Sequence, residues 1–383
     1  MLAFLLARAG VEVLVLEKHM DFFRDFRGDT IHPATTDILA DLGLLDGFLR
    51  LPHTEIAQLE LLVDGSSYRL VDFGHLPTRC RFLTVMPQWD FLDFLSRSAG
   101  EYPTFHLEMG CEATDLLRQG DRVTGVRASM PEGEVEITAP LVVACDGRSS
   151  VLRDRSGLPL RSFGVAMDVL WFRVPRGEGE AHSLGSVGGG QFVITIDRGD
   201  YWQCGVVIQK GSLPALREQG LDAFRHRVMV AAPVVASALA GLRDWDQVKL
   251  LDVRANRLLR WYLPGLLCIG DAAHAMSPAG AVGVNYAIAD AVATANVVAA
   301  PLLRGTLRDE HLAAVQRRRE PPTRHMQALQ AAATGGLNRD LFRPPKTLLR
   351  VVSSLAPARR LMGRTIGLGF RRERVLTPDV WGG

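Results

Sequence analysis

The stretch LPGLLCIGDAAHAMSPAGAVGVNYAIAD, residues 263–290, decides the fold of this chain. Its continuous apolar run, residues 266–269, is typical of a short strand that is covered on both faces of a sheet. Gly270 permits a sharp turn at a place where a side chain would obstruct a ligand. Asp271 then puts a carboxylate at the carboxyl end of the strand, which is where open α/β sheets bind their ligands.

A loop shaped by Pro278 and Gly283 follows, and we predict that a helix opens at Val284. The start of a helix offers free backbone N–H groups and the positive end of a dipole, which suit a phosphate or an electron-rich ring carbonyl. An ordinary strand-to-helix turn is the alternative interpretation. The strand, the Gly-Asp turn, the proline and the glycine-spaced helix start together favour a ligand site.

The beginning of the chain has the pattern of the second half of a nucleotide-binding unit. Residues 1–9 are typical of a helix that ends at Gly10, and residues 11–16 (VEVLVL) predict a buried strand that closes at Glu17. In such a unit the acid at the end of the second strand accepts hydrogen bonds from ribose hydroxyls. A surface glutamate at a strand end is the alternative, and the context favours the ribose role.

Such a unit begins with a strand and a G-x-G-x-x-G turn, about 20 residues before the acid. Counting back from Glu17 puts that turn at or before Met1. We therefore expect the chain to start inside the first helix, because its true start lies upstream or because the protein is naturally truncated.

Three other polar residues stand at positions that suit a ligand. Arg27 lies in a glycine-containing loop ahead of a predicted helix, and a forked guanidinium suits a diphosphate. Gln88 opens a helix, where it could hydrogen-bond a ligand or be simply exposed. Asp146 is a second carboxylate at a strand end, and Ser149 or Ser150 can cap the helix that follows.

Composition and charge narrow the class of protein. The 383 residues are 47% hydrophobic and carry a formal net charge of +2, which does not point to a nucleic-acid partner. Five scattered cysteines without a CxxC pair indicate a reducing compartment, with neither a disulfide framework nor structural zinc, and we expect a cytoplasmic protein. No uncharged apolar run reaches about 18 residues, and the start lacks a basic leader, so we predict neither a transmembrane segment nor a signal peptide.

The middle and the end of the chain differ in pattern. Residues 105–137 predict an antiparallel meander, and strand-like segments between 163 and 209 predict an antiparallel sheet of about four strands. From residue 302 the chain is helical and basic, and Pro321-Pro322 are expected to break the helix. A solvated basic face is favoured there over peripheral contact with an anionic membrane.

Together these motifs resemble the class A flavoprotein monooxygenases, the para-hydroxybenzoate hydroxylase-like FAD family, over about residues 1–330. ARAGVEVLVLEK (7–18), CDGRSSVLR (145–153) and GDAAHAMSPAGAVGVNYAIADA (270–291) are similar to the family's first helix and second strand, its DG motif and its GD motif. The resemblance implies an α/β fold in which a Rossmann-like FAD/NAD(P)-binding domain, N-terminally truncated here, is interleaved with a mainly antiparallel β-sheet substrate domain and followed by C-terminal helices.

The resemblance also implies the chemistry and the site. FAD would be the cofactor and NAD(P)H the co-substrate, and one atom of O2 would hydroxylate an aromatic or polyketide-like small molecule held between the sheet and the flavin. No catalytic base and no metal ligand is implied. The resemblance places Glu17 on the adenosine ribose, Arg27 along the pyrophosphate, and Gln88 at the start of the next helix that contacts FAD. Asp146 would lie where the flavin and the nicotinamide approach each other, and Asp271, in the turn that Gly270 opens, would bind a ribitol hydroxyl. Pro278 would line the flavin ring, and the backbone N–H groups of Gly283, Val284 and Asn285 would face its pyrimidine edge.

We expect three regions on this basis. Residues 1–55, 87–162 and 255–305 would form the discontinuous FAD-binding domain, and residues 56–86 and 163–254 the substrate-binding sheet domain. Residues 306–383 would form a C-terminal helical region. Phe192, Tyr201 and Trp202 are candidates to line the substrate site.

Two departures from the family pattern keep other functions open. The glycine-rich phosphate loop is missing, and Ala281 stands where the family often has the second of two glycines. The alternatives are an FAD-dependent reductase of the same fold and a truncated, non-catalytic paralogue with weak or no FAD binding. The absence of a W-x-W-x-I-P motif argues against a flavin halogenase.

Overall fold

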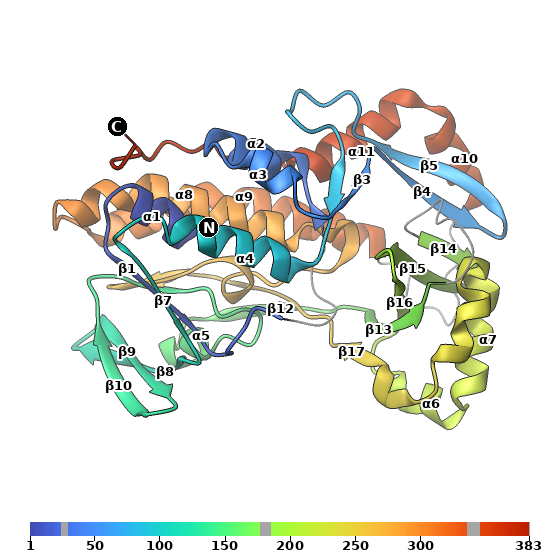
Figure 1. Ribbon diagram of the computed structural model, residues 1–383, viewed down its shortest axis with the longest axis horizontal. Coiled ribbons are helices and arrows are strands. Elements are labelled where there is room, and N and C mark those ends of the chain that lie inside the picture. The colour runs from blue at the N-terminus through green and yellow to red at the C-terminus, as the bar shows by residue number, and fades with distance from the viewer. Residues whose placement is uncertain (24–29, 177–184, 335–344, 383) are drawn as a thin grey trace.

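The computed structural model describes residues 1–23, 30–176, 185–334 and 345–382. Figure 1 shows two parts: helices α1, α4, α8 and α9 lie over a layer of short strands, and a larger sheet carries α6 and α7 at its far end. The helices are α1 (Leu2–Arg8), α2 (Pro33–Asp41), α3 (Leu45–Leu49), α4 (Gln88–Ala99), α5 (Val151–Ser156), α6 (Leu213–Glu218), α7 (Leu221–Ala231), α8 (Gly283–Leu303), α9 (Asp309–Thr334), α10 (Lys346–Ser354) and α11 (Ala356–Leu368).

The first part contains the parallel strands. β1 (Val13–Glu17) pairs in parallel with β7 (Phe105–Met109), and β11 (Val142–Ala144) pairs in parallel with β20 (Leu266–Cys268). Within the described chain no ladder joins the two pairs. α1 packs against α4 and α8, and the amino group of Met1 before it interacts electrostatically with Cys145, just past the end of β11. This arrangement puts the ends of β11 and β20 and the start of α1 at one edge of the core.

Smaller sheets complete this part of the molecule. β19 (Tyr262–Leu263) runs antiparallel to β20, and β12 (Leu160–Phe163) to β18 (Ala255–Leu258). β2 (Thr30–Ile31) and β3 (Thr54–Ile56) flank β6 (Leu83–Val85), while β8 (Glu112–Gln119), β9 (Arg122–Met130) and β10 (Gly133–Thr138) form an antiparallel sheet.

The second part is built on a seven-stranded sheet in which, among the described strands, β14 and β4 pair in parallel and the other neighbours are antiparallel. One face is buried against α6, α7 and the 3-10 helix Pro233–Gly241, through Leu170, Phe172 and Val174 of β13. The alternate residues of β13 therefore point to the other face. In spatial order the strands are β17 (Lys249–Leu251), β13 (Met167–Pro175), β16 (Tyr201–Gln209), β15 (Gln191–Asp197), β14 (Gly185–Gly188), β4 (Gln58–Val63) and β5 (Ser66–Asp72).

Two local predictions are wrong. Residues 105–109 belong not to a meander but to the parallel pair with β1, where half-buried residues alternate with exposed ones. Pro321 and Pro322 lie inside α9 and do not break it. The hydroxyl of Thr323 donates to the carbonyl of Arg319 at 2.9 Å, and packing against α8 holds this stretch helical.

One helix among the described residues, Ala279–Leu303, is long and apolar enough to cross a membrane. Its most apolar window is 61% buried inside the protein, and the helix packs against α1 and α9. It is the core helix of this fold, and the cytoplasmic location stays a prediction.

Candidate active site

The Gly-Asp turn lies at the edge where β20 ends. Gly270 is buried at φ 59°, and a Cβ atom there would lie 3.0 Å from the Cβ of Ala287 on α8. The turn therefore rests directly on α8, and this close approach explains the glycine. The carboxyl side chain of Asp271 is one-third exposed, so it is presented outward from this edge.

The loop before α8 is held in an unusual conformation. Ala281 has φ 52°, in the left-handed region that costs an alanine about 1–2 kcal/mol, and Gly280 before it has φ 78°. The hydroxyl of Thr30 donates to the carbonyl of Ala281 at 3.2 Å and helps to fix it. α8 begins at Gly283, one residue before the predicted start. As at the start of any α-helix, its first backbone N–H groups have no partner within the helix.

The backbone N–H of Asn285 is predicted to face the flavin, whereas its side chain makes hydrogen bonds within the protein. Its Oδ1 accepts from the backbone N–H of His32 at 2.8 Å and from the hydroxyl of Thr35 at 2.7 Å. Its Nδ2 donates to the carbonyl of Thr30 at 3.1 Å. Asn285 thereby fastens the start of α8 to β2 and α2.

Asp146 is occupied by the helix that follows it. The hydroxyl of Ser150 and the backbone N–H of Leu152 both donate to its carboxylate, the latter at 3.2 Å. Ser150, and not Ser149, caps α5 by accepting from the N–H of Arg153. Asp146 therefore shapes the DG turn, and a direct contact with FAD stays a prediction.

Arg148 joins the two turns, and the sequence did not single it out. Its guanidinium lies 3.7 Å from the carboxylate of Asp271 and donates to the backbone carbonyl of Asp252 at 3.4 Å. Asp252 follows β17, so Arg148 connects the DG turn, the GD turn and the margin of the large sheet. Its position two residues after Asp146, in the same predicted turn, could have indicated this role.

The remaining predicted contacts come from other elements. Glu17 ends β1, and its carboxylate accepts from the N–H of His19 at 3.0 Å. Gln88 is half-buried at the first position of α4, beside Trp89, whose ring contacts Phe23 of the loop after β1. Pro278 precedes the short 3-10 helix that leads into α8. Arg27 lies outside the described residues.

The face of the large sheet opposite α6 and α7 contacts the segment after β1. Arg173 of β13 lies over the rings of Phe23 and Tyr201, at 6.0 and 4.9 Å from their centroids. Two residues before it, on the same face, the indole of Trp171 lies across Gly205, where a Cβ would meet the ring at 2.9 Å. Trp171 therefore stands between Phe23 at one end of β13 and the Arg148–Asp252 contact near the other.

The predicted substrate-lining residues divide between the two faces. Tyr201 lies on the same face as Trp171, where its ring contacts Arg173. Trp202 points to the opposite face and is fully buried in the apolar cluster between the sheet and its covering helices, so its prediction as a lining residue is wrong. Phe192 packs against Leu61 near β4.

The sequence of this chain is similar to that of a known protein family and of several characterised proteins. The profile of the FAD binding domain family matches residues 1–330. This chain belongs to that family. It is 31% identical to 6-methylpretetramide 4-monooxygenase of Streptomyces rimosus over 98% of the chain and 90% of that protein. It is 26% identical to dialkyldecalin synthase of Streptomyces rugosporus, of which it spans 61% of the length.

The fold has close counterparts among solved structures. Anhydrotetracycline hydroxylase OxyS of Streptomyces rimosus superposes with a TM-score of 0.77, at 22% identity, over 96% of this chain and 72% of that one. PqsL of Pseudomonas aeruginosa superposes with a TM-score of 0.75, at 21% identity, over 92% and 95%. The predicted family and fold class are confirmed, and the protein is an FAD-dependent monooxygenase.

Proposed function

We propose that this monooxygenase hydroxylates a planar, multi-ring aromatic small molecule of the polyketide type, held between the face of Trp171 and the flavin. The observation that carries this is the flat indole of Trp171 across Gly205, on the sheet face opposite α6 and α7, in a sheet whose margin Arg148 of the DG turn reaches at Asp252. An aromatic face of this kind stacks on flat rings. The name of the 31% identical relative, a 6-methylpretetramide monooxygenase, agrees in substrate class.

The described residues fit FAD at the edge formed by β11 and β20. The unpaired N–H groups at the start of α8 suit the electron-rich edge of the flavin, and the outward carboxylate of Asp271 suits a ribitol hydroxyl. Glu17 would bind the adenosine ribose, and Gln88 and Pro278 would contact the cofactor from α4 and the loop before α8. Bound FAD, reduced by NAD(P)H, would supply the oxygen-activating chemistry.

The protein's own residues would orient the substrate and shield the reaction from water.

We also propose the domain division predicted from the sequence, with residues 1–55, 87–162 and 255–305 holding FAD and residues 56–86 and 163–254 holding the substrate. The described strands are compatible with it, since β13–β17 all lie within 163–254.

A comparison of Trp171→Leu with the wild type tests this proposal. We expect bound flavin to stay at the wild-type level and the KM for a tetracyclic phenol to rise by about tenfold, because a stacked aromatic contact is lost. Trp245→Leu is the matched control, because Trp245 packs against Phe224 on the far side of the sheet.

Product mass then identifies the chemistry. A gain of one oxygen atom, with matching NAD(P)H consumption, is expected from the wild type. NAD(P)H consumption with a reduced product would instead identify a reductase, and an unchanged KM in Trp171→Leu would remove Trp171 from the substrate site.

A further inference from the structure

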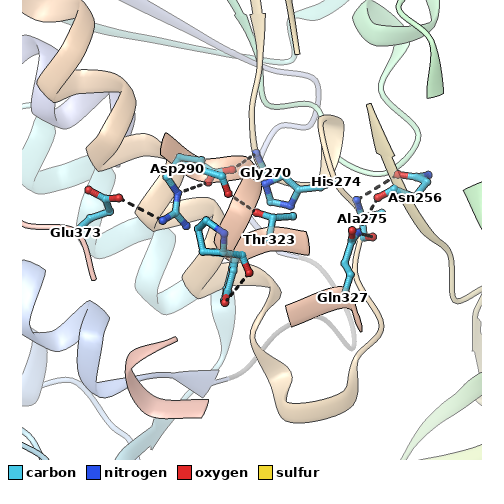
Figure 2. A network of polar contacts seen from close by, with 11 residues as sticks. Asn256, Gly270, His274, Ala275, Asp290, Thr323, Gln327 and Glu373 are labelled. Carbon is cyan, nitrogen blue, oxygen red and sulfur yellow. Dashed lines mark hydrogen bonds and ion pairs between the residues drawn. The ribbon is translucent and has the colours of Figure 1, made fainter. Parts of the chain in front are cut away.

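A buried carboxylate stands behind the Gly-Asp turn. Asp290 of α8 is fully buried, and its Oδ2 accepts from the backbone N–H of Gly270 at 3.0 Å and faces the Nε2 of His274 at 2.6 Å. Its Oδ1 accepts from the Nε of Arg319 on α9 at 2.7 Å. Figure 2 shows these groups converging on Asp290 from the turn and from the neighbouring helix.

These bonds fix the turn at both of its ends. The N–H of His274 donates to the carbonyl of Gly270 at 2.8 Å, so residues 270–274 close on themselves. Asp290 then holds the first N–H and the last side chain of that closed turn. Asp271 lies inside it, so the direction of its carboxylate depends on the anchorage behind.

The charge on Asp290 is well compensated. Burial by itself raises the pKa of this carboxyl, but the contacts with His274 and Arg319 outweigh burial and place the pKa below its ordinary value. The carboxylate is therefore ionised, and its Nε2 neighbour on His274 acts as a donor. A buried charge of this kind is tolerated only while its partners remain in place.

The chain of charges continues to a segment far along the sequence. The Nη1 of Arg319 lies 3.3 Å from Glu373, which is buried and also accepts from Arg318 at 2.8 Å. Glu373 follows α11, and Figure 2 shows it on the opposite side of Asp290 from Gly270 and His274. Its neighbours Arg372 and Arg374 form ion pairs with α2, so the segment is fastened on both sides.

We propose that Asp290, Arg319 and Glu373 form a positioning relay for FAD, through which the segment after α11 sets the Gly-Asp turn from behind. This inference rests on the proposed FAD site at Asp271. None of the three residues needs to touch the cofactor. They act by holding the N–H of Gly270 and the ring of His274.

Two readouts test the relay, one of them without FAD. Hydrogen exchange of the full chain is measured without added FAD on Asp290→Asn and Glu373→Gln. We expect faster exchange in residues 266–276 and unchanged exchange in β9. The dissociation constant of FAD is measured on the same proteins, and we expect a rise of at least about tenfold for Asp290→Asn and about threefold for Glu373→Gln.

Controls separate positioning from general loss of stability. Glu60→Gln removes another ion-paired carboxylate, in β4, and is expected to leave both readouts unchanged. The double variant Asp290→Asn/Glu373→Gln changes both carboxylates that flank Arg319. We expect its loss of FAD affinity to be smaller than the product of the two single losses, because both residues act through Arg319.

The outcomes distinguish the relay from the site on which it rests. Unchanged exchange in residues 266–276 in both single variants overturns the relay. Wild-type FAD affinity in both variants also overturns it, provided that Asp271→Ala weakens binding. FAD affinity that is insensitive to Asp271→Ala overturns the proposed site, whereas the exchange result still decides whether the relay holds the turn.

Discussion

The substitution Asn285→Ala is the sharpest test of how the start of α8 is held. It removes the acceptor for the N–H of His32 and the hydroxyl of Thr35, and the donor for the carbonyl of Thr30. All three partner residues are buried, so water does not replace the lost amide.

The magnitude follows from that count. Each buried polar group left without a partner costs about 1–3 kcal/mol, and the hydroxyl of Thr35 can turn towards another acceptor. We therefore expect the free energy of unfolding to fall by about 3 kcal/mol. Urea unfolding followed by circular dichroism measures it, with the midpoint compared at unchanged slope.

Asn296→Ala is the matched control for Asn285→Ala. Asn296 lies on the same helix and also makes two backbone hydrogen bonds, to Arg374 and Leu376, but these are exposed. Water can replace them, and we expect a loss of about 1 kcal/mol or less. An equal loss in both variants, or a loss below about 1 kcal/mol in Asn285→Ala, would mean that this amide does not hold the start of α8.

Three further predictions concern the site and its surroundings. Asp271→Ala should weaken FAD binding in a fluorescence titration and hardly change stability, because its partly exposed pair with Arg148 contributes little; unchanged affinity would remove it from the site. Burial lowers the pKa of His32 to about 4, so between about pH 6.5 and 4 the unfolded chain binds a proton that the folded protein does not. The free energy of unfolding of the wild type should therefore fall relative to that of His32→Gln by up to about 3 kcal/mol over this pH range, and parallel pH profiles would contradict this. Gly205→Ala should push Trp171 aside and raise the KM for the aromatic substrate while flavin content is kept; a wild-type KM would mean that the ring tolerates the added methyl.

Local sequence determined the strand–turn–helix unit at residues 263–290. The apolar run appears as β20, Gly270 has a positive φ, and α8 begins one residue before its predicted start. These features depend on near neighbours: backbone freedom at glycine and the burial of consecutive apolar residues. The family and its FAD chemistry could be read from the same motifs.

The tasks of individual polar side chains could not be read in this way. The side chain of Asp146, predicted near FAD, binds Ser150, and that of Asn285, for which only a backbone contact was predicted, binds the β2–α2 segment. Any carboxylate or amide near a turn can serve the scaffold or a ligand. The choice depends on which donors other segments bring within reach.

Local motifs alone place a nucleotide-type turn before a long apolar helix, with one acid, Asp290, within that helix. The contacts of Asp290 with Gly270, His274 and Arg319, and of Arg319 with Glu373, depend on how distant segments pack. A charge is stable in the interior only beside its counter-charges. Those counter-charges come from segments far apart in the chain, so packing alone assigns the partners.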